Sequence, residues 1–349
     1  MNLNTISDII VFKSLEFIKH GNIQLINYDN KHYNFGNSEE ELKVKLKINK
    51  PGLTYQIIKN GDIGLAEAYM RGDFEADNLT NLIELTAKNI KLIYKFSGLL
   101  DFSIINNIKS FFIKNDKSRS KKNISKHYDL GNDFFSLWLD PSLTYSSAIF
   151  EKQESNLETA QMNKYKKLLS LINPNVGDKI LEIGCGWGGF AEFVGKNYDI
   201  KMDCITISQK QFEYASKRIF ENGLNEKVKI KLKDYRDVRE KYNSIASIEM
   251  IEAVGKNYLS NFFNIIKSNL SEKGKAAIQA ITINDDLFER YKTKEDFIQK
   301  YIFPGGFLPS KKSLYNITSN KGLLIDSYNS YGFHYSNTLK LWSNQFFNK

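Results

Sequence analysis

The sequence contains only two cysteines, Cys185 and Cys204, in 349 residues. Two cysteines form no disulfide framework, and because their spacing matches no metal-ligand pattern we expect no metal site. Long apolar runs are also missing: no stretch approaches the roughly 18 apolar residues that a membrane-spanning helix needs. Residues 1–13 carry no basic segment followed by an apolar core, so we expect no signal peptide. These absences predict a cytoplasmic protein that contacts a membrane only from outside.

The charge balance is basic. A net charge of +9 favours an anionic partner, which is either nucleic acid or an acidic membrane surface. With 42% hydrophobic and 26% charged residues, the composition is that of an ordinary soluble globular protein. A chain of 349 residues exceeds one comfortable hydrophobic core, so we expect two domains.

Residues 1–95 resemble a small α+β domain in their pattern. Short alternating apolar runs predict an antiparallel meander, and helical periodicity follows it. The predicted strands are 23–27, 31–35 and 42–48, and the predicted helices are 62–71 and 78–95. The acids of these helices form no catalytic constellation, so we interpret them as solvated faces. Contact with lipid is a further role that we keep open for this domain.

Residues 96–122 form a predicted linker. Apolar residues at helical spacing in 104–113 precede a basic run from Lys114 to Lys122 that only Asp116 opposes. Such a segment can hold a protein on anionic lipid at about 1 kcal/mol per basic side chain, and a solvated hinge is an equally good interpretation. Nucleic-acid binding is disfavoured because interleaved aromatic residues and a known module are both missing.

Residues 123–349 alternate between strand and helix patterns, which predicts a doubly wound, mostly parallel sheet of Rossmann-like class with six or seven strands. The candidate strands are 179–183, 202–207, 228–232, 244–249 and 275–281. The candidate helices are 159–172, 189–197, 209–222 and 258–269. Ligands of such sheets bind beyond the carboxyl ends of the strands, so we expect the functional residues there.

A glycine turn follows the first of these strands. Gly184, Gly186 and Gly188 allow positive φ and a close approach of the backbone to a ligand, and a helix begins directly after them. Dinucleotide sites need an acid at the end of the second strand, and none is present there. Glu182 is instead placed to orient a cationic ligand. The pattern therefore favours S-adenosylmethionine over a pyrophosphate-bearing cofactor.

Polar residues also follow the next three strands. Thr206, Ser208 and Gln211 supply hydroxyls and an amide for a ribose after the second strand. Asp234 and Tyr235 follow the third strand, where an adenine amino group could donate to a carboxylate. The segment 249–255 follows the fourth strand and puts two acids beside the donor. Each stretch alone could be solvated surface, whereas together they mark one ligand site.

These residues carry a family likeness. The chain resembles the cyclopropane-fatty-acid synthases and related fatty-acyl-phospholipid methyltransferases that use S-adenosylmethionine. The matching stretches are His127–Phe135, Leu143–Ala148, Glu182–Gly189, Thr206–Gln211, Asp234–Arg236, Glu249–Gly255 and Tyr301–Ser310, with Gly61–Met70 in the small domain. Of the family's branches, the chain looks more like the plant-type one.

The resemblance implies a mechanism. The π bond of an unsaturated acyl chain attacks the donor methyl, and a base then takes a proton from the new methyl so that the ring closes. In the family that base is a bicarbonate ion held by cysteine, glutamate, histidine and tyrosine. The corresponding positions here are Ser147, Glu252, Gln279 and Tyr335, so two residue types match and two do not. Ser147 and Gln279 can still donate hydrogen bonds to an anion, but neither adds positive charge.

The resemblance also implies the remaining roles. Gly184, Gly186 and Gly188 would hold the amino-acid end of the donor with Glu182 near its ammonium, and Tyr145 and Ser146 would close over it. The substrate would be a phospholipid with unsaturated acyl chains at the inner face of the cell membrane. A product without a ring, a lipid-binding protein with a decayed site and a homodimer are alternatives that the sequence leaves open.

Overall fold

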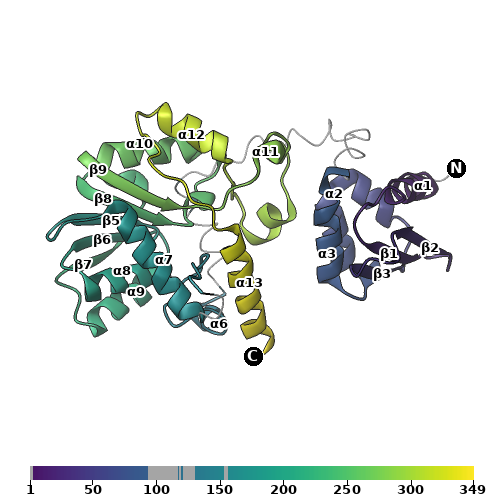
Figure 1. Cartoon of the computed structure of the whole chain (residues 1–349), viewed down its shortest axis with the longest axis horizontal. Coiled ribbons are helices and arrows are strands. Elements are labelled where there is room, and N and C mark those ends of the chain that lie inside the picture. The colour runs from purple at the N-terminus through teal and green to yellow at the C-terminus, as the bar shows by residue number, and fades with distance from the viewer. Residues whose placement is uncertain (1–2, 93–116, 118, 121–129, 153–155) are drawn as a thin grey trace. The chain divides into compact units, whose positions relative to one another are not determined.

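The computed structural model describes residues 3–92, 117, 119–120, 130–152 and 156–349 (Figure 1). The chain divides into two compact units, residues 1–112 with 294–297 and residues 113–293 with 298–349. Most of the predicted linker, 96–122, lies outside the described residues. No helix in the described part of the chain is long and apolar enough to cross a membrane.

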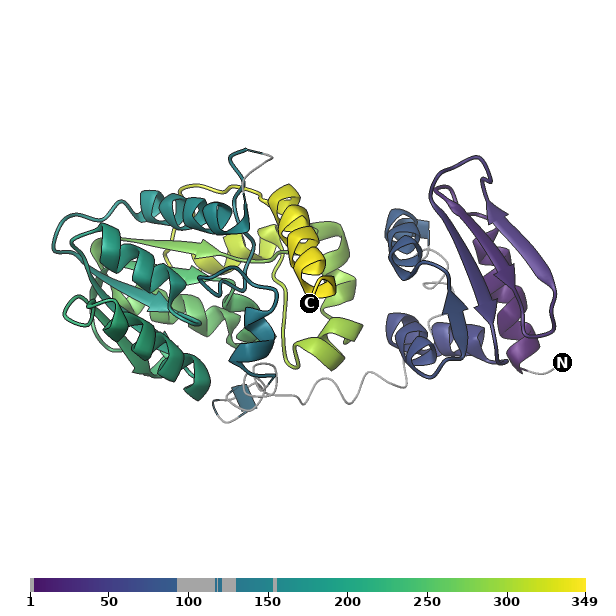
Figure 2. The same cartoon turned by 90° about the horizontal axis from the view of Figure 1, so that it is seen from below.

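The first unit is a four-stranded sheet with helices packed on it (Figure 2). Its apolar strand positions alternate with exposed lysines, as in Lys43–Ile48, and so bury one face of the sheet. Its elements are α1 (Leu3–Leu15), β1 (Asn22–Ile26), β2 (His32–Gly36), β3 (Lys43–Ile48), α2 (Leu53–Met70), β4 (Phe74–Ala76) and α3 (Leu79–Lys88). The helix α2 is kinked at Gly61, and its second half covers most of the helix predicted at 62–71.

The predicted antiparallel meander is wrong in one pairing. The sheet order is β2-β1-β3-β4, and β1 pairs with β3 in parallel. After β2 the chain passes the amino-terminal end of β1. Two hydrogen bonds mark this passage: Asn37 N donates to Gly21 O, and Asn22 N donates to Leu42 O. This crossing places β2 and β3 on opposite sides of β1. Alternation in the sequence predicts strands, but not which neighbour each strand pairs with.

The second unit contains a five-stranded sheet of order β7-β6-β5-β8-β9, and every pairing in it is parallel. The strands are β5 (Lys179–Ile183), β6 (Lys201–Thr206), β7 (Val228–Leu232), β8 (Tyr242–Ile248) and β9 (Leu270–Gln279). The doubly wound fold class is confirmed. The predicted number of six or seven strands is wrong for the described residues: beyond β9 the chain forms only an isolated bridge, between Ile283 and Ser310.

Helices cover both faces of this sheet (Figure 1). The helices α7 (Leu157–Ile172), α8 (Gly189–Asn197) and α9 (Gln209–Glu221) bury apolar side chains on one face. On the other face lie α10 (Leu259–Asn269) and α12 (Lys311–Ser319). The remaining helices are α6 (Asn132–Ser136), α11 (Asp285–Tyr291) and α13 (Gly332–Phe347), with short turns η3 (Tyr235–Asp237), η4 (Ile251–Ala253), η5 (Lys256–Tyr258) and η6 (Ile298–Ile302).

The last helix, α13, packs against the segment between α6 and α7. Thr338 Oγ1 accepts a hydrogen bond from Ala148 N at 3.0 Å, and His334 Nδ1 accepts one from Phe150 N at 3.1 Å. Trp342 meets Trp138 edge-on with ring centroids 5.3 Å apart. The helix α13 thereby fixes the segment that contains Tyr145 and Ser146, the two residues that the resemblance predicts to close over the donor.

Candidate active site

The glycine turn connects β5 to α8 with three positive φ angles: +84° at Gly184, +54° at Gly186 and +84° at Gly188. A Cβ on Gly184 would lie 2.5 Å from Met250 Cγ, so only glycine fits between the turn and the segment after β8. A Cβ on Gly186 would meet no heavy atom within 4 Å. The turn therefore packs tightly on Met250 and leaves space at Gly186, where a ligand can approach the backbone.

Glu182 is buried two residues before this turn, with an exposed fraction of 2%. Burial raises the pKa of its carboxyl to about 7, against the opposing influence of the Cys204 thiol and the Lys164 ammonium. Its Oε2 is buried and has no hydrogen-bond partner among the described residues. A buried carboxylate oxygen without a donor suits a ligand that brings its own ammonium group.

The three polar residues after β6 hydrogen-bond to one another. Thr206 Oγ1 donates to Gln211 Oε1 at 2.9 Å, and Ser208 N donates to Thr206 Oγ1 at 3.2 Å. Ser208 also caps α9 by accepting from Gln211 N. The structure therefore brings these three residues together at the carboxyl end of β6 in a fixed arrangement.

Asp234 and Tyr235 follow β7 and begin η3. Asp234 accepts two side-chain hydrogen bonds from the guanidinium of Arg236, at 2.8 and 2.7 Å. The Tyr235 ring packs edge-on against Phe262, and burial raises the pKa of its phenol to about 12. Its hydroxyl is buried without a partner in the described part of the chain. Tyr235 thus contributes to the core and also offers one unpaired polar atom.

Two polar residues of α7 hold the segment that follows α6. Gln161 Nε2 donates to Ser146 O at 3.0 Å, and Lys164 Nζ donates to Ser146 Oγ at 2.6 Å. Lys164 is 1% exposed. Burial lowers the pKa of its ammonium to about 7, while the carboxylates of Glu249, Asp140 and Glu182 act in the opposite direction. Lys164 is therefore a buried cation placed among three acids.

Aromatic rings surround Tyr145 on this segment. Phe135, Trp138 and Trp342 lie with their ring centroids 5.5, 5.3 and 5.4 Å from it. Phe303 stacks on it at 6.4 Å. Burial raises the pKa of the Tyr145 phenol to about 12, and Glu249 adds to this. The ring therefore stays neutral among these aromatic side chains.

The predicted anion-binding residues Ser147, Glu252, Gln279 and Tyr335 surround a further acid, Glu249. Its Oε1 accepts hydrogen bonds from Ser147 N at 2.9 Å and from Gln279 Nε2 at 2.8 Å. Tyr335 lies close enough for Glu249 and Glu252 to raise the pKa of its phenol further after burial, which is the main cause. The structure thus brings together residues from the ends of β8 and β9, from α13 and from the segment after α6.

Glu252 lies in η4 and is partly exposed. Its Oε1 accepts a hydrogen bond from Ile281 N, and its Oε2 is buried without a partner among the described residues. Burial raises the pKa of its carboxyl to about 8, and the charge of Glu249 adds to this. Glu252 is therefore the acid of this cluster that is protonated at neutral pH.

Comparison with known proteins identifies the family to which the chain belongs. A family model described as mycolic acid cyclopropane synthetase matches residues 115–349, and one for a domain of unknown function matches residues 12–95. The chain belongs to the mycolic acid cyclopropane synthetase family. It is 34% identical to the tuberculostearic acid methyltransferase UfaA1 of Mycobacterium tuberculosis over 311 residues, which are 86% of this chain and 72% of that protein.

Other members of the synthetase family agree with this assignment. The cyclopropane-fatty-acyl-phospholipid synthase of Escherichia coli is 33% identical over 306 residues, covering 86% of this chain and 76% of that protein. The crystal structure of the mycolic acid cyclopropane synthase CmaA1 with SAH superposes with a TM-score of 0.60 at 29% identity, over 64% of this chain and 82% of that chain. The protein is an S-adenosylmethionine-dependent methyltransferase.

The residues of the glycine turn fit this donor. The open space at Gly186 and the unpartnered Glu182 Oε2 can take the amino-acid end of S-adenosylmethionine. When bound, the donor supplies an electrophilic methyl group. Met250, the residue after Glu249, packs on Gly184, so the acid cluster lies next to the glycine turn.

Lys164 is missing from the residues predicted for this site, and Glu249 is missing from the residues predicted to hold the anion. Lys164 shares the inward face of α7 with Ala160, Leu168 and Gln161. A lysine in an apolar stripe is the signal that could have found it. Glu249 is one of the two acids that the sequence places beside the donor, but the pattern does not show that its side chain contacts Gln279.

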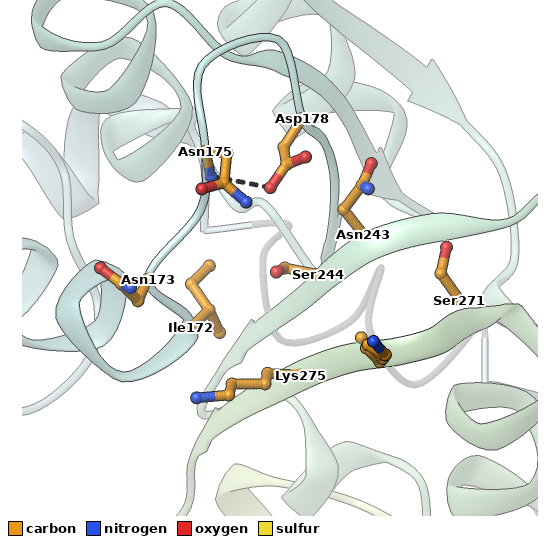
Figure 3. Close-up of a pocket in the computed structure, with 10 residues that line it drawn as sticks. Ile172, Asn173, Asn175, Asp178, Asn243, Ser244, Ser271 and Lys275 are labelled. Carbon is orange, nitrogen blue, oxygen red and sulfur yellow. Dashed lines mark hydrogen bonds between the residues drawn. The ribbon is translucent and has the colours of Figure 1, made fainter.

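A cavity of about 300 Å³ lies elsewhere in this unit (Figure 3). It is lined at the amino-terminal ends of β5 and β8 by Asp178 and Asn243, with Lys275 of β9 beside them. Asn175 N donates to Asp178 Oδ2 at 2.8 Å across its rim. Because the glycine turn follows the carboxyl end of β5, this cavity lies at the opposite edge of the sheet and takes no part in the site.

Proposed function

We propose that the protein transfers the methyl group of S-adenosylmethionine to the double bond of an unsaturated acyl chain in a membrane phospholipid and forms a cyclopropane ring. Membership of the synthetase family and the similarity to a relative named cyclopropane-fatty-acyl-phospholipid synthase support this substrate class. Residue assignments at both the donor side and the acid cluster are part of the proposal.

The observation that carries the proposal is the half-buried acid cluster beside the glycine turn. Addition of a methyl group to an alkene leaves a positive charge on the neighbouring carbon, and ring closure then needs a base. Glu249 and Glu252 are half-buried carboxyl groups at this place, and Glu249 is polarised by hydrogen bonds from Ser147 and Gln279. A positioned carboxylate can act as the base that ring closure needs.

The other residues bind the donor and shield the site from water. Glu182 holds the donor ammonium, the glycine turn approaches the amino-acid end, and Thr206 with Gln211 faces the ribose, while Asp234 and Tyr235 serve the adenine. The aromatic ring of Tyr145, stacked with Phe303, excludes water and stabilises the positive charge on the acyl chain through its π face. Water must be excluded because it would quench that charge as an alcohol.

A second product is favoured by specific observations. Serine and glutamine stand at 147 and 279, where the resemblance leads us to expect cysteine and histidine, and one relative is named tuberculostearic acid methyltransferase. A hydride shift before proton loss gives a methylene-bearing chain in place of a ring. Both products need a base that takes a proton from the added methyl group.

The proposed place of action is an anionic membrane surface at the inner face of the cell membrane. The net charge of +9 supports attraction to anionic lipid, which salt would weaken. The basic run from Lys114 to Lys122 would contribute five basic side chains to it. A homodimer stays a prediction, as does the absence of nucleic-acid binding.

The experiment is product analysis with vesicles of an anionic phospholipid that carries monounsaturated chains, with the donor labelled in its methyl group. We expect the label in the acyl chain, and proton NMR distinguishes a cyclopropane methylene from a vinylic methylene of the same mass. A saturated methyl branch is heavier by two hydrogens. Unmodified acyl chains together with failure to bind the donor in a calorimetric titration would contradict the proposal and favour a lipid-binding protein.

A further inference from the structure

Glu249 fills the centre of the predicted anion site. Its Oε1 accepts hydrogen bonds from Ser147 N and Gln279 Nε2, so the Gln279 amide that the sequence assigns to an anion donates to Glu249. Gln279 Nε2 also donates to Ser147 O at 3.0 Å, which closes the arrangement. Within the described residues all hydrogen bonds to the Glu249 carboxylate end on Oε1, so Oε2 is left to accept a proton.

The backbone at Glu249 is held in an unusual conformation. Its φ is +45°, which L-residues with a Cβ rarely adopt and glycine adopts without strain. The main chain is secured there, because Glu249 N donates to Gln279 O at 2.9 Å. Gln279 therefore holds both the backbone and the side chain of Glu249. A strained residue that is kept by such contacts indicates that its side chain has a function.

The titratable groups that face Glu249 come from α7, η4, α13 and the segment after α6. Lys164 on α7 favours its ionised form, as do the donors at Gln279 and Ser147, while burial raises the pKa of the carboxyl. Glu252 in η4 and Tyr145 and Tyr335 are the other titratable groups facing it. Their own pKa values are raised, so both phenols and the second carboxyl are neutral when Glu249 is ionised. An ionised Glu249 would therefore face the Lys164 ammonium and three neutral groups.

We propose that the Glu249 carboxylate is the built-in base of the reaction and replaces a dissociable anion such as bicarbonate. This inference rests on the proposed function, since it names the group that receives the proton. Ser147 and Gln279 then act as positioning residues through their N–H groups. The serine and glutamine that depart from the expected cysteine and histidine hold a carboxylate of the chain itself and no longer need to bind a free ion.

The step balances as follows. Once the methyl group has been added to one alkene carbon, the other alkene carbon is cationic. Glu249 Oε2 takes one proton from the added methyl group, and the C–H electron pair forms the third bond of the ring at the cationic carbon. If a hydride moves first, the same electron pair forms a methylene double bond. Glu249 leaves the step as a neutral acid and returns its proton to water after product release.

The test compares the wild type with Glu249→Gly and Glu249→Gln in buffer depleted of carbon dioxide, with and without added bicarbonate or formate. We expect the wild-type rate to be independent of either anion. Glu249→Gly should lose about 100-fold in rate and regain about tenfold with the anion, because a general base contributes this order of rate and the deleted side chain leaves room for it. Glu249→Gln should stay inactive with either anion, because its amide fills the space without being basic.

Thermal unfolding is a second measurement, which does not depend on enzyme activity. Glu249→Gly should keep or raise the melting temperature, since glycine relieves the positive φ. A wild-type enzyme that needs bicarbonate, or a Glu249→Gly variant that no anion stimulates, would overturn the inference and leave the proposed function standing. A wild type that modifies no acyl chain under any of these conditions would overturn both.

Discussion

The donor side and the acid side of this site are assembled differently. On the proposed donor side, the groups interact with near neighbours in the sequence. The glycine turn directly follows β5, and Thr206, Ser208 and Gln211 hydrogen-bond to one another at the carboxyl end of β6. On the acid side, Glu249 contacts Ser147 and Gln279, which lie 102 and 30 residues away in sequence. Local geometry therefore makes the donor site, whereas tertiary packing makes the acid site. Variants that disturb one side without the other test this division.

The largest effect is expected from Gly184→Ala, which acts where the two sides touch. The new Cβ would lie 2.5 Å from Met250 Cγ, at a φ of +84°. We expect a loss of about 2 to 4 kcal/mol in the free energy of unfolding, measured with urea, because strain and overlap add. Donor binding should be lost with it, since the turn must move away from its present position.

Gly223→Ala is the matched control. It has a φ of +67° with no heavy atom within 4 Å of the added Cβ. Only backbone strain of about 1 kcal/mol is expected there, with unchanged donor binding. Equal losses in the two variants would show that positive φ alone, and not contact between the turn and Met250, explains the effect.

A smaller effect, dependent on pH, is expected from Glu252→Gln. The pKa of Glu252 is raised from 4.5 to about 8, so between these values the folded protein keeps a proton that the unfolded chain has lost. This carboxyl therefore makes folding less stable as pH rises through that window. In the variant, the oxygen of the side-chain amide can still accept the hydrogen bond from Ile281 N. The variant should gain about 3 °C or more in melting temperature over the wild type at pH 8, and less at pH 5.

Melting curves of both proteins across pH 5 to 8 check this prediction. A difference that stays constant with pH would mean that Glu252 does not titrate in this window, and the assignment of Glu252 as the neutral acid of the cluster would fail.

The smallest effect is expected from Ser147→Cys. The position contributes its backbone N–H to Glu249, while its hydroxyl donates to Ala148 O at 3.3 Å. Restoring the cysteine that the resemblance leads us to expect should therefore leave the rate and the ratio of ring to methylene product within about twofold, as for a substitution that keeps the key hydrogen bond. NMR of the lipid product measures both. A ring that forms only in the cysteine variant would transfer the decisive role from Glu249 to position 147.

Much of the second unit could be predicted from the sequence because its signals are local. Buried β-branched runs followed by glycine or by a capping residue such as Ser208 marked β5, β6 and the helices after them to within a residue or two. The absence of an acid after β6 separated the donor from a dinucleotide. These features depend on neighbours in the chain, which the sequence displays directly.

The remainder depends on contacts between distant residues. The parallel pairing of β1 with β3 follows from the crossing at Gly21, which strand alternation does not encode. Lys164 stands out as a lysine in the apolar stripe of α7, but the sequence does not show that its partner is Ser146. Glu249 resembles any acid at a strand end until its positive φ and its contact with Gln279 are seen. In each case tertiary structure decides the role of a residue whose type allows several.

Calorimetric titration of the donor into Glu182→Gln and Glu249→Gln, followed by turnover of the same samples, tests the division between the two sides most directly. Glu182→Gln should weaken donor affinity about 10- to 100-fold, because it removes a charged acceptor whose buried Oε2 has no other partner in the described chain. Glu249→Gln should bind the donor as the wild type does and yet turn over at least about 100-fold more slowly. Donor affinity that falls in parallel with turnover in Glu249→Gln would contradict the account.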